Sequence, residues 1–212
     1  MKATAIIPVK RFSVAKQRLA AGVDEGRREA LVAAMLDDVL AAIGKARSIE
    51  RTIVVSDEPG ALESAAGAGA EVVPDPGEGH SEAALAGIAH AQQGGTECVV
   101  LLPGDCPLLE PRELDRLLTG VPASYVAIVP DRHGTGTNAL VLAPPQAIRP
   151  AFGEGSCARH VTAAREAGVP FAVEELSSLA LDLDTPADIV AITRVLESGR
   201  GQARRTAKAL GL

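Results

Sequence analysis

Short apolar runs alternate along this chain with segments in which apolar residues recur every three or four positions. The first pattern is typical of buried strands, and the second is typical of amphipathic helices. Strands are expected at residues 4–8, 52–55, 71–73, 98–102, 125–129, 139–142, 171–173 and 179–183. Helices are expected between them, at residues 27–46, 59–66, 82–92, 111–118, 157–167 and 186–196.

The alternation of strands and helices predicts an α/β fold with three layers, α/β/α, built on a mainly parallel (mixed) sheet. Several strand runs, such as CVVLL at 98–102, are apolar throughout, as expected for strands covered by helices on both faces. The helix expected from Pro186 has a complete start signal, because Thr185 can cap it and Asp188 can close a capping box.

Residues 1–197 are interpreted as a single domain, because they contain no linker and no internal repeat. Residues 198–212 form a basic, glycine-bounded C-terminal tail. This tail is expected to be either mobile or a short terminal helix, and no function is assigned to it.

The composition restricts the classes of partner. The net charge of -6 gives no general attraction to the phosphates of a nucleic acid. With one tyrosine, three phenylalanines and no tryptophan, the chain also has few aromatic side chains on which bases could stack. No apolar run is long enough to cross a membrane, and the N-terminal apolar stretch is too short for a signal peptide. The three cysteines lack the spacing of a disulfide framework or a zinc site, so a cytoplasmic protein is expected.

Two aspartates stand close together in LDLDTPAD, at residues 181–188. On a strand, Asp182 and Asp184 would point to the same face, with Leu183 turned into the core. Their like charges repel each other unless a cation lies between them. The alternative is that Asp184 only helps to cap the following helix and that Asp182 is solvated.

A third aspartate, Asp105, follows the apolar run at 98–102 and a Pro103-Gly104 break, and Pro107 prevents an immediate helix. In open α/β sheets, ligands bind outside the carboxyl ends of the strands, which is where this side chain is expected. Aspartates gathered at one sheet edge suit magnesium, which takes few carboxylates and completes its shell with water and substrate phosphates. An ordinary turn aspartate is the alternative.

A basic loop follows the first predicted strand, in PVKRFSVAKQRL at residues 8–19. Its cations are Lys10, Arg11, Lys16 and Arg18. Such a loop can bind a triphosphate, because Lys supplies a flexible positive charge and the Arg guanidinium can donate two parallel hydrogen bonds to a phosphate. The alternative is a solvated surface loop. Neither a GxxxxGK[ST] nor a GxGxxG motif is present, which argues against a P-loop kinase and a dinucleotide-binding dehydrogenase.

Two glycine-rich stretches, HGTGTNAL at 133–140 and FGEGSCARH at 152–160, are candidates for anion binding. Glycines such as Gly153 let the backbone approach a ligand closely. Thr137 offers a hydroxyl, and Ser156 can cap a helix whose first amides favour a phosphate or a carboxylate. Two ordinary glycine turns with a serine cap are the alternative.

Taken in order, IIPVKRFSVAKQRLA, LLPGDCPLL, GTGTNALVL, FGEGS and LDLDTPAD resemble the phosphoenolpyruvate/2-phospho-L-lactate guanylyltransferase family. The resemblance spans roughly residues 3–197. It implies a nucleotidyltransferase domain with a glycosyltransferase-A-like fold, which acts in the biosynthesis of coenzyme F-420. It also implies GTP as the nucleotide donor, magnesium (Mg2+) as the cofactor and a small phosphorylated three-carbon acid as the acceptor.

The resemblance implies roles for individual residues as well. The metal-binding aspartates of the family correspond to Asp105, Asp182 and Asp184. The positions that hold the phosphoacid correspond to Thr137, Gly153 and Ser156. The lysine of the N-terminal loop corresponds to Lys16, so Lys16 and Asp105 are the expected catalytic residues. Lys10 is expected to join Lys16 in neutralising the nucleotide phosphates.

The stretch GHSEAALAG at 79–87 departs from the Gly-Leu-Asn run that the family usually has there, which leaves recognition of the guanine base open. Glu82 could accept hydrogen bonds from guanine, or it could be an ordinary first-turn helix residue. The scattered histidines are interpreted as structural or solvated; they are His80, His90, His133 and His160.

The expected reaction is attack by the acceptor phosphate on the α-phosphorus of GTP, which needs no general base because the nucleophile is already anionic. Two other functions stay open. One is a molybdenum-cofactor or sugar-phosphate nucleotidyltransferase, although such enzymes typically have a glycine-rich first loop that this chain lacks. The other is a non-catalytic GTP-binding regulatory module. The choice between phosphoenolpyruvate and 2-phospho-L-lactate is also open, with PVKRFSVAK resembling actinobacterial members and favouring phosphoenolpyruvate. A homo-oligomer is possible.

Overall fold

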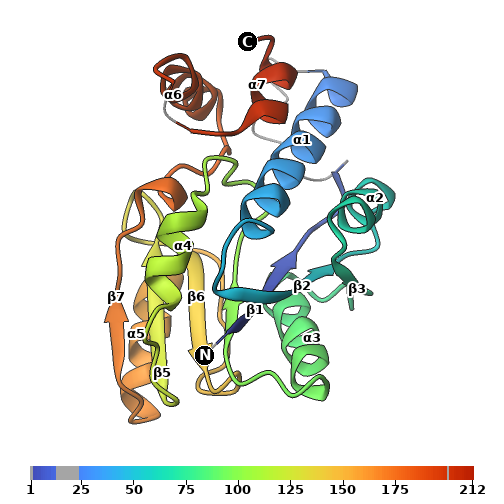
Figure 1. The fold of residues 1–212 in the computed structure, drawn as a ribbon. Coiled ribbons are helices and arrows are strands. Elements are labelled where there is room, and N and C mark those ends of the chain that lie inside the picture. Colours follow the sequence, from blue (N-terminus) through green and yellow to red (C-terminus); the bar gives the residue numbers. More distant parts are fainter. Residues whose placement is uncertain (1, 13–23, 200) are drawn as a thin grey trace.

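The computed structural model describes residues 2–12, 24–199 and 201–212, in which strands and helices alternate (Figure 1). The strands are β1 (Ala3–Pro8), β2 (Ile49–Val55), β3 (Glu71–Val73), β4 (Val99–Leu101), β5 (Tyr125–Pro130), β6 (Thr137–Ala143) and β7 (Phe171–Val173). The helices are α1 (Glu25–Ile43), α2 (Pro59–Ala68), α3 (His80–Gln93), α4 (Pro111–Leu118), α5 (Ser156–Glu166), α6 (Pro186–Glu197) and α7 (Arg204–Leu210), with a short 3-10 helix, η3 (Ser177–Leu179). None of these described helices is both long and apolar enough to span a membrane.

The described strands form one seven-stranded sheet in the order β3-β2-β1-β4-β6-β5-β7. Strand β1 runs parallel to β2 and β4, β2 runs parallel to β3, and β5 runs parallel to β7. Only β6 is antiparallel to its neighbours β4 and β5 among these strands, so the predicted mixed and mainly parallel sheet is confirmed. Because β1 and β4 are adjacent and parallel, their carboxyl ends at Pro8 and Leu101 open on one edge of the sheet.

Helices cover both faces of the sheet (Figure 1). Two adjacent residues of β1 belong to the cores on its two faces. Ile7 belongs to a core that includes Met35 of α1, on one face of the sheet. Ile6 points to the opposite face and belongs to a second core, which includes Ile88 of α3 and Ala164 of α5. Successive strand residues are therefore buried on opposite sides, which confirms the predicted three-layer arrangement and explains the continuous apolar runs.

The prediction of a strand at residues 179–183 is wrong. The chain forms η3 here and then an irregular segment that leads into α6. Its backbone makes individual hydrogen bonds instead of the regular ladder of a strand. The Asn138 side-chain amide donates to the carbonyl of Leu179 at 2.6 Å, and the N–H of Leu183 donates to the carbonyl of Asp105 at 3.2 Å. Leu179 and Leu183 are completely buried, so the segment has the apolar pattern of a strand without a neighbouring strand to pair with.

The basic C-terminal segment contains helix α7, which lies against α1 (Figure 1). Ala203 precedes this helix and has no side-chain group that could cap it. The buried carboxylate of Asp38 on α1 takes that role by accepting hydrogen bonds from the backbone N–H groups of Arg205 at 3.2 Å and Thr206 at 2.8 Å. A distant helix therefore supplies the cap that fixes the end of the chain.

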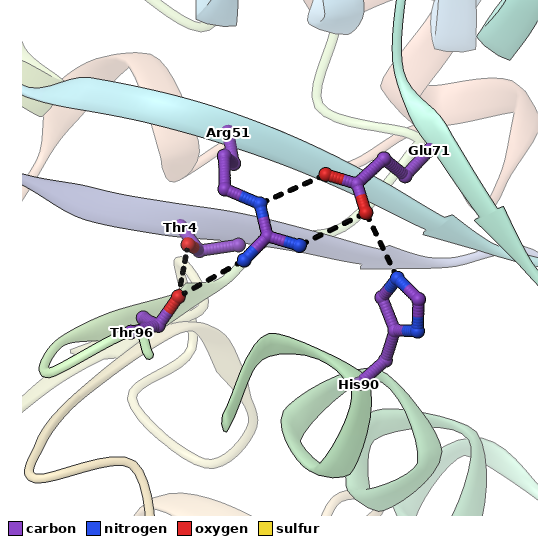
Figure 2. Close-up of polar contacts among 5 residues, drawn as sticks. All are labelled: Thr4, Arg51, Glu71, His90 and Thr96. Carbon is purple, nitrogen blue, oxygen red and sulfur yellow. Dashed lines mark hydrogen bonds and ion pairs between the residues drawn. The ribbon is translucent and has the colours of Figure 1, made fainter. Parts of the chain in front are cut away.

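A polar network near the amino ends of β1, β2 and β3 joins five side chains (Figure 2). The Arg51 guanidinium of β2 donates twice to the Glu71 carboxylate of β3, at 2.8 and 2.9 Å, and once to Thr96. Thr96 also lies 2.8 Å from the hydroxyl of Thr4, and His90 of α3 lies 2.8 Å from the Glu71 carboxylate. The hydrogen bonds from Arg51, followed by the one from His90, lower the pKa of the Glu71 carboxyl to about 2. This network stabilises the end of the sheet opposite to the carboxyl ends of β1 and β4.

Candidate active site

A cavity of about 310 Å³ lies at the carboxyl ends of β1 and β4. Its polar side chains come from four segments: Lys10 after β1, His80 at the start of α3, Asp105 after β4 and Asp184 before α6. Val32 and Leu36 of α1 also line it. A larger hollow of about 490 Å³ beside α4 and β5 is lined by none of the described residues that were predicted for the site.

The two loops that carry the predicted metal ligands are joined directly. The N–H of Leu183, between Asp182 and Asp184, donates to the carbonyl oxygen of Asp105 at 3.2 Å. The Leu183 side chain is completely buried, so it anchors the acidic loop in the core. The structure thus brings Asp105 and Asp184 to one cavity and places Asp182 two residues earlier in the same loop.

The start of α6 fixes the backbone of Asp184. The Asp188 carboxylate accepts hydrogen bonds from the N–H of Asp184 at 3.0 Å, from the N–H of Thr185 at 2.7 Å and from the Thr185 hydroxyl at 2.9 Å. The predicted capping box is therefore confirmed. The same buried carboxylate is paired with Arg132, which ties the acidic loop to the loop between β5 and β6. Burial acts to raise the pKa of Asp188, but the hydrogen bonds from Thr185 and Asp184 and the charge of Arg132 lower it overall.

Within the described residues, no three His, Cys, Asp or Glu side chains are arranged so that they could hold a metal ion. The magnesium site of three aspartates is not formed in advance as a cluster, and it stays a prediction. The donor set of the cavity, which consists of the Asp105 and Asp184 carboxylates, nevertheless fits magnesium. This ion is usually bound through one or two carboxylates, with water and substrate phosphates completing the octahedron.

Lys10 gives the cavity a positive side chain. Lys16, which was predicted to act with it, lies outside the described residues. Burial lowers the pKa of the His80 imidazole, the charge of Asp105 raises it, and the charge of Lys10 lowers it, with a net decrease. His80 is therefore neutral at pH 7, and Lys10 is the cation that the described lining residues present to the cavity.

The residues predicted to hold the phosphoacid come together where β6 and α5 begin. The Ser156 hydroxyl donates to the Thr137 hydroxyl at 3.1 Å, and the N–H of Ser156 donates to the carbonyl of Gly153 at 3.0 Å. Gly153 has a φ of 109° and Gly155 has a φ of 70°, a region of backbone conformation that favours glycine. The loop between these glycines can therefore turn sharply into the first turn of α5.

Arg159 shapes this loop. Its guanidinium donates hydrogen bonds to the backbone carbonyl oxygens of Ala151, Phe152 and Glu154. In a trans peptide the N–H points away from the preceding carbonyl, so the N–H groups of Gly153 and Gly155 point away from Arg159. The N–H groups of Ser156 and Cys157 in the first turn of α5 already donate to the carbonyl oxygens of Gly153 and Thr135. The amides of the glycine loop are therefore the backbone donors here that suit an anion.

Phe152 connects this loop to the cavity. Its ring makes edge-to-face contacts with His80, at 4.9 Å between ring centroids, and with His160, at 5.3 Å. Its backbone N–H donates to the Ser81 hydroxyl at 3.0 Å. Because His80 lines the cavity and Phe152 belongs to the loop, the cavity and the group of anion donors are neighbours.

A family model described as "Guanylyl transferase CofC like" matches residues 3–211. The chain belongs to this family. The phosphoenolpyruvate guanylyltransferase of Conexibacter woesei is 46% identical to it, over 97% of this chain and 94% of the relative. The 3-phospho-D-glycerate guanylyltransferase of Phenylobacterium zucineum is 38% identical, over 91% and 90%. The 2-phospho-L-lactate guanylyltransferase of Methanothermobacter thermautotrophicus is 35% identical, over 89% and 83%.

The fold of this CofC-like chain also resembles solved structures. A nucleotidyl transferase from Methanothermobacter shares it with a TM-score of 0.67, over 93% of this chain and 99% of that chain, at 20% sequence identity. At this identity the likeness establishes the fold alone. The prediction of a nucleotidyltransferase fold is confirmed, and the chain is a nucleotidyltransferase by its family.

The sequence patterns miss two residues that shape the site. The interpretation of His160 as structural or solvated overlooks its contact with Thr137, whose hydroxyl lies 3.0 Å from the imidazole Nδ1. A signal was present, because Ser156 directly precedes the helix predicted at 157–167 and His160 lies one turn after it. Arg159 acts on backbone carbonyl oxygens, which a sequence pattern does not place, so no signal could have found it.

Proposed function

We propose that this protein transfers the GMP group of GTP to the phosphate of phosphoenolpyruvate and releases pyrophosphate. The observation that carries the proposal is the Asp105–Leu183 hydrogen bond, which places two acidic loops at a cavity that adjoins the anion donors around Gly153. A polyphosphate site beside a second anion site suits a reaction between two phosphate esters. The names of the three relatives support guanylyl transfer to a small phosphoacid, and the family resemblance supports a place in coenzyme F-420 biosynthesis.

Asp105 and Asp184 are proposed to hold Mg2+, with Asp182 as a third ligand from the same loop. When bound, the ion supplies positive charge that offsets the charges of the phosphates of both substrates. Lys10 adds a positive charge on the side of β1, and Lys16 is proposed to do the same from the N-terminal loop. These side chains bind and orient the triphosphate of GTP.

The acceptor phosphate is anionic at neutral pH, so its oxygen can attack the α-phosphorus without a general base. One P–O bond forms between the acceptor and the α-phosphorus, and the bond from the α-phosphorus to the β-phosphate oxygen breaks. Negative charge increases on the departing pyrophosphate while two polyanions are held together. Catalysis is therefore mainly positioning and charge stabilisation, and the neutral His80 needs no role in proton transfer.

The phosphoacid is proposed to bind at Thr137, Gly153 and Ser156. The hydroxyl of Thr137 and the N–H groups of the loop offer donors to its phosphate or carboxylate oxygens. The buried Ser156 supports them by donating its hydroxyl proton to Thr137. Phosphoenolpyruvate is chosen as the acceptor because two relatives named for it are 46% and 42% identical to this chain. Relatives named for the other two acids are 38% and 35% identical.

The mass of the product tests this proposal. The protein is incubated with magnesium, GTP and one acid: phosphoenolpyruvate, 2-phospho-L-lactate or 3-phospho-D-glycerate. We expect release of pyrophosphate and a product with the mass of GMP joined to the acid, most rapidly with phosphoenolpyruvate. ATP and CTP serve as matched controls for the base and should give far less product.

The other outcomes are equally informative. Product from only one of the other two acids would correct the acceptor and keep the reaction. Release of no pyrophosphate with any of the acids, by a protein that still binds GTP, would contradict the proposal and favour a GTP-binding regulatory module.

A further inference from the structure

His160 is completely buried inside the candidate phosphoacid site, one turn after Ser156 on α5. Both ring nitrogens of this histidine have a partner. The N–H of Ala151 donates to Nε2 at 2.9 Å, and the Thr137 hydroxyl lies 3.0 Å from Nδ1. One imidazole thus touches the start of the anion-binding loop and the first residue of β6.

The two contacts settle the protonation of the ring. Burial, followed by the charge of Arg159, lowers the pKa of His160 to about 4, so the imidazole is neutral at pH 7. Nε2 accepts a hydrogen bond from Ala151 and therefore carries no proton. The single ring proton must sit on Nδ1, which then donates to the oxygen of Thr137.

The Thr137 hydroxyl oxygen also accepts a hydrogen bond from the Ser156 hydroxyl, at 3.1 Å. A hydroxyl oxygen has two lone pairs and one proton. His160 and Ser156 occupy both lone pairs, so the proton of Thr137 must point away from these two residues. Thr137 is only partly buried, so this proton is available to a ligand.

We propose that His160 is a positioning residue for the phosphoacid, which orients the Thr137 hydroxyl so that it donates to an anionic oxygen of the bound acid. The inference rests on the proposed function and deepens it. His160 itself does not touch the acid. Through Ala151, the same imidazole also holds the loop whose amides face the ligand, so it sets two groups of the site at once.

Two conservative variants separate these two contacts. The side-chain amide of Asn can place a donor near the position of Nδ1 but does not extend to Nε2. The side-chain amide of Gln can place an acceptor near the position of Nε2 but leaves no donor near Nδ1. His160→Asn therefore keeps the contact with Thr137, and His160→Gln keeps the contact with Ala151.

The test is the Michaelis constant for each substrate. We expect His160→Gln to raise the KM for the phosphoacid about tenfold, as expected for the loss of one hydrogen bond to a charged group. The KM for GTP and kcat should change less than about twofold, and His160→Asn should recover most of the loss. Thr137→Val removes the hydroxyl, so adding His160→Gln to it should cause little further loss.

Three results would overturn the inference. The first is a loss from His160→Gln that is equally large in the wild-type and Thr137→Val backgrounds. The second is an increase in the KM for GTP that matches the increase for the acid, as expected from a purely structural role. The third is a 15N NMR spectrum in which His160 carries its proton on Nε2, or on both nitrogens, at pH 7. A fourth outcome concerns the proposed function itself: if the wild-type protein forms no product with any of the acids, both the function and the inference fail. The three results above differ from it, because in each of them the wild-type protein is active.

Discussion

The backbone N–H of Leu183 donates a hydrogen bond to the carbonyl oxygen of Asp105, with 3.2 Å between nitrogen and oxygen. Leu183 stands between Asp182 and Asp184, and its side chain is completely buried. The hydrogen bond therefore holds the loop of Asp105 beside the loop of Asp182 and Asp184. The buried Leu183 side chain anchors the second loop in the core. The position of the acidic groups depends on a residue that has no charge.

Leu183→Ala should weaken both the fold and the site. We expect the free energy of unfolding to fall by about 2–5 kcal/mol, because the change leaves a cavity in the core. We expect kcat to fall as well, because the loop is no longer anchored beside Asp105. Urea denaturation and pyrophosphate release measure the two effects, and Leu183→Met, which keeps the volume, should cost less than about 1.5 kcal/mol. Wild-type turnover by the Ala variant, measured where it is fully folded, would contradict this role.

Glu71 should make stability depend on pH in the acidic range. Its pKa is lowered from 4.5 to about 2 in the folded protein, by Arg51 first and then by His90. A carboxylate with a lowered pKa stabilises the fold above its unfolded pKa and loses that contribution as pH falls toward the folded value. We expect Glu71→Gln to be less stable than the wild type at pH 7, and the difference to shrink between pH 4.5 and about 2. Denaturation with urea at several pH values measures it, and the exposed Glu166→Gln serves as the control. A difference that stays constant over this range would show that the pKa of Glu71 is not lowered.

Asp38 should hold α7 against α1. We expect Asp38→Ala to lower the free energy of unfolding by about 1 kcal/mol, the usual cost of losing a helix cap. Hydrogen exchange of the Arg205 and Thr206 amides should become faster, because both donate to this carboxylate. Asp37→Ala is a matched control, because Asp37 pairs with Arg205 on the surface, and surface pairs contribute little. Equal exchange rates in the two variants would argue against the cap.

Most of the fold follows from patterns inside single segments. The run at 98–102 contains β4, and the Thr185-Pro186 signal marks the observed start of α6. Residues 179–183 show the limit of such patterns. Hydrophobic periodicity reports that Leu179 and Leu183 are buried, but it does not report whether another strand lies beside them.

The candidate site also has features that the sequence predicts and features that it does not. Residue type and position at a strand end were enough to place Asp105 at the cavity. Asp184 lies there too, although the strand that was predicted before it is absent. The capping box that fixes the backbone of Asp184 was predicted, because it lies within one segment. The contacts between distant segments were beyond prediction, because their loops must first be placed in space. The ion pair of Arg132 with Asp188 is one example, and the hydrogen bonds from Arg159 to backbone carbonyls are another.

The central claim is that the Asp105 carboxylate helps to hold the divalent ion that allows GTP and a phosphoacid to react. The most direct test is pyrophosphate release from GTP and phosphoenolpyruvate by Asp105→Asn over a range of magnesium concentrations. We expect turnover to fall at least about 100-fold, because charge stabilisation by a metal is worth several kcal/mol, with an unchanged melting temperature. The control is Asp57→Asn, an exposed aspartate beyond the end of β2, which should keep wild-type turnover. Near-normal turnover of Asp105→Asn at the magnesium concentration that saturates the wild type would contradict the claim.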